Sequence, residues 1–95
     1  MDEIQITKMA VETFGRESQI EMAIEECAEL IDALCKLRRN RVFVDAVVTE
    51  IADVQIQIMM AQLCHIFGIN AVAAERLRKI KRLERRIAAH DGNKG

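Results

Sequence analysis

Residues 18–38, SQIEMAIEECAELIDALCKLR, decide the fold class of this chain. Ser18 followed by Glu21 has the spacing of a capping box, in which each side chain accepts a hydrogen bond from the other residue's backbone N–H. The pattern predicts a helix from Ser18 to the polar cluster at 38–41. Apolar residues recur along it at steps of three and four, the period of an amphipathic helix: Ile20, Ala23, Ile24, Cys27, Leu30, Ile31, Leu34 and Leu37.

The flanking segments predict three further helices. Each has a capping side chain at its start, and a glycine ends the first and the third: Asp2 to Phe14 with Gly15, Asp45 to Phe67 with Gly68, and Asn70 to about residue 90. The third is apolar nearly all round and therefore needs neighbours on several sides. The fourth is strongly basic, with a narrow apolar stripe: Val72, Ala73, Leu77, Ile80, Leu83 and Ile87.

Length and composition favour one all-α domain. The chain has 95 residues, no proline and four glycines, so it lacks the chain breakers that an all-β domain needs. We expect a single domain over 1–95, a four-helix bundle with its core at about 10–87 and a frayed tail at 91–95. Since 51% of the residues are hydrophobic, more than one small core needs, we also expect a homo-oligomer, a dimer or a tetramer.

The charge distribution is more informative than the net charge of −1. Residues 2–32 carry nine acids and two bases, whereas residues 75–95 carry eight bases and three acids. No N-terminal signal is present and no apolar run approaches about eighteen residues, so we expect a cytoplasmic protein without a membrane partner. Three cysteines without a C-x-x-C pair argue against a disulfide framework or a zinc site, and we expect them to be buried.

Two pairs of carboxylates need an explanation. Glu26 and Glu29 are three residues apart on the second predicted helix, as are Glu50 and Asp53 on the third, so each pair lies on one helix face. The second pair is embedded in apolar residues, where an uncompensated carboxylate is costly. An all-oxygen cluster of this kind suits a hard divalent cation, Mg²⁺ or in its place Mn²⁺. The alternatives are a solvated acidic face at 25–29, and salt bridges from Glu50 and Asp53 to the basic fourth helix.

The two motifs resemble those of a known family. Glu25-Glu26-Cys27-Ala28-Glu29, followed by Glu50-Ile51-Ala52-Asp53, is similar to the E-E-x-x-E and E-x-x-D motifs of the MazG-like nucleotide pyrophosphohydrolases, in the all-α NTP pyrophosphatase superfamily. The resemblance covers about residues 10–87. It includes Phe14-Gly15 and Gln19 before the first motif, and Lys79 and Arg82 in the place of the family's K-x-x-R element.

The resemblance implies a function and roles for these residues. It implies that a nucleoside triphosphate is cleaved between its α and β phosphates, giving a monophosphate and pyrophosphate in a nucleotide-pool or house-cleaning role. Glu26, Glu29, Glu50 and Asp53 would then bind Mg²⁺. Glu25 would be a further ligand or, with Glu26, a catalytic carboxylate that orients water, and Lys79 and Arg82 would contact phosphate oxygens. Many relatives stack the base on tryptophan or tyrosine, which this chain lacks, so the ring candidates are Phe14, Phe43, Phe67 and His65.

A second class of function is a non-enzymatic module. Seven of the fourteen basic residues lie between 76 and 86, on a helix that could face nucleic-acid phosphates. Because no recognition motif or stacking aromatic residue accompanies them, we disfavour nucleic acid as a partner. A helical oligomerisation module is the other alternative.

Overall fold

The computed structural model describes residues 1–59 and 62–94, and within these ranges the chain is helical with short junctions and contains no strand. The predicted all-α class is therefore confirmed. The elements follow one another in the order α1 (Glu3–Phe14), α2 (Arg16–Arg38), α3 (Val44–Val54), a π-helix (Gln55–Met59), α4 (Gln62–Phe67) and α5 (Ile69–Lys94).

The first helix begins and ends where the sequence predicts. The Asp2 carboxylate accepts a hydrogen bond from the Gln5 backbone N–H at 2.8 Å, and the Gln5 side chain accepts one from the Asp2 backbone N–H at 2.9 Å. This capping box satisfies two backbone donors that the first turn of a helix leaves free. Gly15, with a φ of +91°, ends the helix in a conformation that favours glycine.

The other three helices begin earlier than predicted. Arg16 starts α2 directly after Gly15, so Ser18 lies in the first turn rather than at the N-cap. Gly15 separates the two helices by a single residue, and its carbonyl accepts the hydrogen bond of the Gln19 backbone N–H at 3.1 Å. Gly68, with a φ of +107°, has the same effect before α5, which begins at Ile69 instead of after Asn70.

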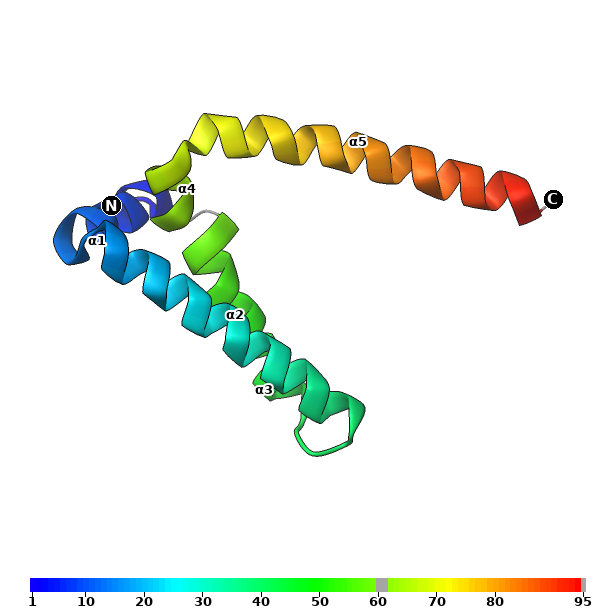
Figure 1. Ribbon diagram of the computed structural model, residues 1–95, viewed down its shortest axis with the longest axis horizontal. Helices are drawn as coiled ribbons and strands as arrows, with labels where there is room; N and C mark the ends of the chain where they lie inside the picture. The colour runs from blue at the N-terminus through cyan, green and yellow to red at the C-terminus, as the bar shows by residue number, and fades with distance from the viewer. Residues whose placement is uncertain (60–61, 95) are drawn as a thin grey trace.

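The α2–α3 hairpin is the centre of the fold. The polar cluster at 38–41 ends α2 as predicted, and Asn40 has the positive φ, +57°, that turns the chain. The third helix begins at Val44 with Phe43 at the N-cap, so the predicted cap, Asp45, lies in its first turn, where a carboxylate still favours the helix dipole. Figure 1 shows α2 and α3 packed side by side.

The buried apolar side chains of the described structure are small. Ala23 and Ala33 of α2 and Val47 of α3 are buried, and Cys64 of α4 is the fourth buried apolar residue among those described. Ile24 and Ile31, which belong to the predicted apolar stripe of α2, are 65% and 63% exposed. The predicted apolar stripe of α2 is therefore only partly covered in the single chain: Ala23 is buried, while Ile24 and Ile31 are exposed.

The third predicted helix is interrupted. Between α3 and α4 the chain forms a π-helix at Gln55–Met59, and residues 60 and 61 of the predicted segment lie outside the described residues. A π turn holds an extra residue and so rotates the residues that follow it about the helix axis. The α4 helix packs on α1, where Thr7 Oγ1 and His65 Nε2 are 3.0 Å apart. Gly68 ends α4 as predicted.

The fourth predicted helix does not pack along the other three. Figure 1 shows α5 leaving α4 and extending away from the α1–α4 unit. All residues from 71 to 92 are exposed, and the molecule measures 54 × 37 × 23 Å. The predicted bundle-like character is thus shown by α1–α4, while α5 extends away from them in the single chain. The helix includes residues 91–94, where we expected fraying, while Gly95 lies outside the described residues.

One segment is more apolar than the sequence analysis indicated. Val44–Phe67 contains an 18-residue window long and apolar enough, by composition, to cross a membrane. Core helices of soluble proteins pass the same test, although only 29% of this window is buried in the single chain. The segment includes Glu50 and Asp53, which lie on α3 in the hairpin with α2.

Candidate metal centre

The hairpin brings carboxylates from both helices into one cluster. One oxygen each of Glu26, Glu29 and Glu50 can be chosen so that all three lie within 4.8 Å of one another. We call these three residues the acidic cluster. Two come from α2, three positions apart and so on one face, and the third comes from the middle of α3. Of the four predicted metal ligands, the structure therefore places three together.

The environment of the cluster disfavours negative charge. Glu26 and Glu50 are partly buried, and one carboxylate oxygen of each, Oε2, is enclosed without a hydrogen-bond partner. Burial raises the pKa of Glu26, and repulsion from neighbouring carboxylates, Glu29 first, raises it further. The pKa of Glu50 is raised for the same two reasons. The ionised forms of Glu26 and Glu50 would therefore be stabilised by a positive charge beside them in the hairpin.

Asp53 lies beside the acidic cluster rather than in it. Its charge contributes to raising the pKa of both Glu26 and Glu50, so it is within electrostatic reach of each. It is half-buried and lies three positions after Glu50 on the same helix. Glu25 is exposed and lies about 100° around α2 from Glu26, on the solvent side of the hairpin. The structure leaves both as neighbours of the cluster.

No basic side chain in the described part of the chain pairs with these acids. Its two ion pairs both lie within single helices, between Lys36 and Asp32 at 2.8 Å and between Arg78 and Glu75. The salt bridges from Glu50 and Asp53 to the basic fourth helix, our alternative explanation, are therefore absent from the described structure.

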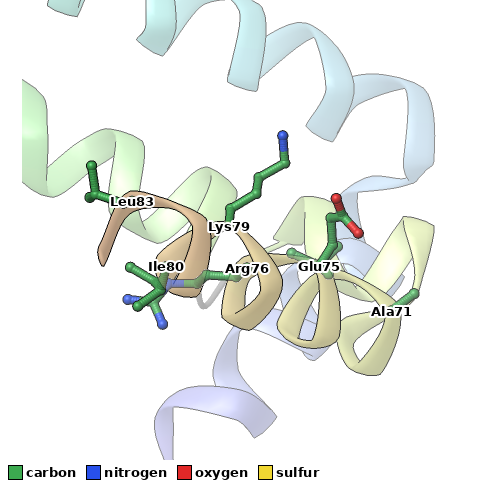
Figure 2. A pocket seen from close by; sticks show the side chains of 7 residues that line it. Ala71, Glu75, Arg76, Lys79, Ile80 and Leu83 are labelled. Atoms are coloured by element: carbon green, nitrogen blue, oxygen red, sulfur yellow. The ribbon is translucent and has the colours of Figure 1, made fainter. Parts of the chain in front are cut away.

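The two predicted phosphate-binding residues are not brought to the cluster within one chain. Lys79 and Arg82 lie on the exposed part of α5, which extends away from the hairpin. Figure 2 shows Lys79 projecting from α5 together with Glu75, Arg76, Ile80 and Leu83. Neither residue is among the charges that shift the pKa of Glu26 or Glu50.

The three phenylalanine candidates for stacking the base are exposed, and His65 is half-buried. Phe14, Phe43 and Phe67 are 64%, 88% and 59% exposed, so none of the three is a core residue of the single chain. The guanidinium of Arg16 lies over the Phe67 ring, 5.6 Å from the ring centroid. The His65 ring contacts Thr7 through its Nε2 atom. Of the cysteines, Cys64 is buried, Cys27 is half-buried and Cys35 is exposed, so the expectation of three buried cysteines holds for one.

Sequence reasoning overlooked two buried amides. Gln57 and Gln62 are buried, and the Oε1 atom of each lacks a hydrogen-bond partner, as does that of Gln19 on α2. Gln57 lies in the π-helix, where the α-helical spacing from Glu50 and Asp53 does not apply, so no pattern in the sequence indicated its burial. The amides add neutral oxygen atoms to the polar interior of the unit.

A hard divalent cation fits this donor set. Ligand oxygens on opposite sides of one Mg²⁺ are about 4.2 Å apart, because each lies about 2.1 Å from the ion. Oxygens on adjacent sides of the ion are about 3.0 Å apart, so the cluster, whose three oxygens lie within 4.8 Å of one another, has to contract when an ion binds. The enclosed oxygens of Glu26 and Glu50 have no competing protein donor. The absence of histidine and cysteine from the cluster disfavours zinc.

Comparisons with protein-family models, with curated proteins and with solved structures find no significant match. The interpretation of the cluster therefore rests on its own geometry and on the two sequence motifs.

Proposed function

We propose that this chain is a Mg²⁺-dependent nucleoside triphosphate pyrophosphohydrolase, which converts a ribo- or deoxyribonucleoside triphosphate to the monophosphate and pyrophosphate. The observation that carries the proposal is the convergence of Glu26, Glu29 and Glu50 across the α2–α3 hairpin, where the pKa values of Glu26 and Glu50 are raised and no basic partner is present in the described structure. The two sequence motifs support it, because Glu26 and Glu29 belong to E-E-x-x-E and Glu50 belongs to E-x-x-D.

The residues divide the chemistry between them. Glu26, Glu29, Glu50 and the adjacent Asp53 would hold the ion, which when bound offsets phosphate charge and lowers the pKa of a coordinated water. Glu25 is exposed beside them and is the carboxylate available to orient the attacking water. No covalent nucleophile is needed, because phosphoryl transfer depends mainly on positioning and charge stabilisation.

Cationic side chains complete the proposal. The pyrophosphate leaving group carries several negative charges, and an ammonium or guanidinium group stabilises it as the phosphoanhydride bond breaks. We assign this role to Lys79 and Arg82. Since α5 of one chain is remote from its own hairpin, the assignment requires that another copy or a movement of α5 bring them close.

Pyrophosphate release tests the proposal. Purified protein is offered a panel of ribo- and deoxynucleoside triphosphates with Mg²⁺ or with chelator, beside Asp53→Ala and the control Glu12→Ala on the exposed surface of α1. The proposal requires metal-dependent release by the wild type and the control and its loss in Asp53→Ala. Silence across the panel, with no rise in melting temperature on adding Mg²⁺, would reject it.

A further inference from the structure

Two exposed apolar surfaces lie on different helices of the chain. The first, which we call the α5 stripe, consists of residues that are each 38% to 55% exposed: Val72, Leu77, Ile80, Leu83 and Ile87. Part of it appears in Figure 2. The second, the α2 groove, is a hollow of about 450 Å³. It is lined mainly by Ile20, Ile24, Cys27 and Ile31 of α2, with Leu63 and Phe67 of α4.

The single chain exposes more surface than a folded monomer of its size. Its accessible surface is 7503 Å², whereas a monomer of 10.8 kDa is expected to expose about 5,500 Å². Its radius of gyration is 16.7 Å, against about 12 Å for a compact chain of this length. The excess, about 2,000 Å², exceeds the roughly 800 Å² that each partner buries in a standard protein interface.

The interior of the single chain is correspondingly small. The four buried apolar residues in the described structure are Ala23, Ala33, Val47 and Cys64, and no large side chain there is fully buried. Burial of apolar surface is the dominant favourable contribution to folding. The chain therefore needs a second surface to cover its isoleucines and leucines, because its own α5 extends away from α2 (Figure 1) and contributes no residue to the lining of the α2 groove.

The charges beside the two surfaces have opposite signs. On α2, Glu21, Glu25 and Asp32 each follow a groove residue by one position, and so form an exposed acidic ridge along one side of the groove. On α5, three basic residues at steps of three and four run along one edge of the stripe: Lys79, Arg82 and Arg86. A copy of this chain thus offers both the apolar stripe and the charges that the α2 groove lacks.

We propose that α5 of one copy lies in the α2 groove of a second copy, and that the two copies exchange this contact reciprocally about a twofold axis. The arrangement covers both stripes and both grooves, which is the closed solution for identical subunits. The 26 residues of α5 span about 39 Å, enough to cover the whole groove. Lys79 and Arg82 then lie along the partner's acidic ridge, beside its Glu25. The contact is independent of the proposed hydrolysis, because it can be measured on inactive protein.

Sedimentation equilibrium of the full chain gives the first test. The wild type should have twice the mass of the 10.8 kDa chain. Leu83→Glu on the stripe and Ile24→Glu in the groove should each weaken dimerisation by at least about tenfold, because either places a charge in an apolar contact. Arg85→Glu, on the side of α5 away from the stripe, is the matched control and should leave the mass unchanged. A monomeric wild type, or variants that keep the dimer, would overturn the proposal.

Cross-linking identifies the surface that α5 occupies. Leu83→Cys is combined with Cys35→Ser, and the protein is treated with a short bis-maleimide. The expected product has dimer mass and disappears when Cys27→Ser removes the thiol of the α2 groove. A linked product of monomer mass would place α5 on its own chain. A dimer product that persists without Cys27 would place α5 on α5. Binding of a DNA duplex to monomeric chains, weakening steeply with salt, would assign the helix to nucleic acid. Each of these three results rejects the proposed contact.

Discussion

Replacing Glu26 with glutamine removes one negative charge from the acidic cluster while keeping the size of the side chain. Two unit charges 4.8 Å apart repel by about 0.9 kcal/mol in water, and physiological salt reduces this to about 0.5 kcal/mol. Since the oxygens of Glu26 and Glu29 approach within that distance, Glu26→Gln should stabilise the metal-free protein by at least about 0.5 kcal/mol. For a domain of this size, that is a rise of about 2–4 °C in melting temperature.

With Mg²⁺ present, the wild type should become more stable than Glu26→Gln. At ten times its dissociation constant, a ligand that binds only the folded state adds about 1.4 kcal/mol, so wild-type protein should melt about 6–11 °C higher. Glu26→Gln should lose most of this rise, because it removes one charged ligand of the ion. Differential scanning fluorimetry with chelator and with Mg²⁺ measures both effects. Glu12→Gln, exposed on α1, is the control and should behave as the wild type.

Two results would refute the reasoning. If Glu26→Gln were less stable than the wild type in chelator, the carboxylate would be paired with a cation in solution and would need no metal. If the variant kept the full rise with Mg²⁺, the ion would bind elsewhere on the chain.

Three further predictions follow from the same structure. Because the pKa values of Glu26 and Glu50 are raised, the folded chain holds protons more tightly than the unfolded chain. The stability of the metal-free protein should therefore increase as the pH falls from neutral, through the raised pKa values, to the ordinary glutamate range. Thermal unfolding in chelator should show this gain, which should be smaller in Glu26→Gln, and a loss of stability over the same pH range would contradict the prediction. Lys79→Ala should lower the rate of triphosphate cleavage about tenfold or more while leaving the Mg²⁺-dependent melting shift intact, whereas equal loss of both would make the lysine structural. Asn40→Val should cost about 1–2 kcal/mol in urea unfolding because Asn40 has a φ of +57°, while Asn40→Gly should be close to neutral; equal effects of the two would show that the turn does not require this conformation.

The local features of the fold were predictable because each depends on a few neighbouring residues. The capping box of Asp2 and Gln5 and the two glycines with positive φ, Gly15 and Gly68, mark helix boundaries on their own. The helix starts at Ser18 and Asp45 were misplaced, because a glycine or an extended residue just before each helix lets it begin earlier than the best capping side chain.

The packing of the helices was less predictable because it depends on distant contacts. The predicted apolar stripe of α2 includes Ala23, which is buried, but also Ile24 and Ile31, which are exposed, whereas Ala33 outside the stripe is buried. Nothing in the periodicity of α2 tells which of these residues a neighbouring helix covers. The departure of α5 from the bundle likewise depends on where a second surface is available, which a single helix pattern does not encode.

The acidic cluster was predictable in its membership but not in its details. The steps of three residues placed Glu26 with Glu29, and the apolar surroundings of Glu50 called for compensation, so three of the four expected ligands converge. The π-helix after Asp53 and the buried amide of Gln57 were not expected, because a π turn arises from packing and has no clear signal in one sequence.

Pyrophosphate release with Mg²⁺ and with chelator, for wild type and Asp53→Ala, tests the central claim most directly. The account predicts release that requires the metal, that Asp53→Ala lacks, and that Glu12→Ala retains. Release that continued in chelator, or that survived Asp53→Ala unchanged, would contradict the assignment of the chemistry to the α2–α3 hairpin.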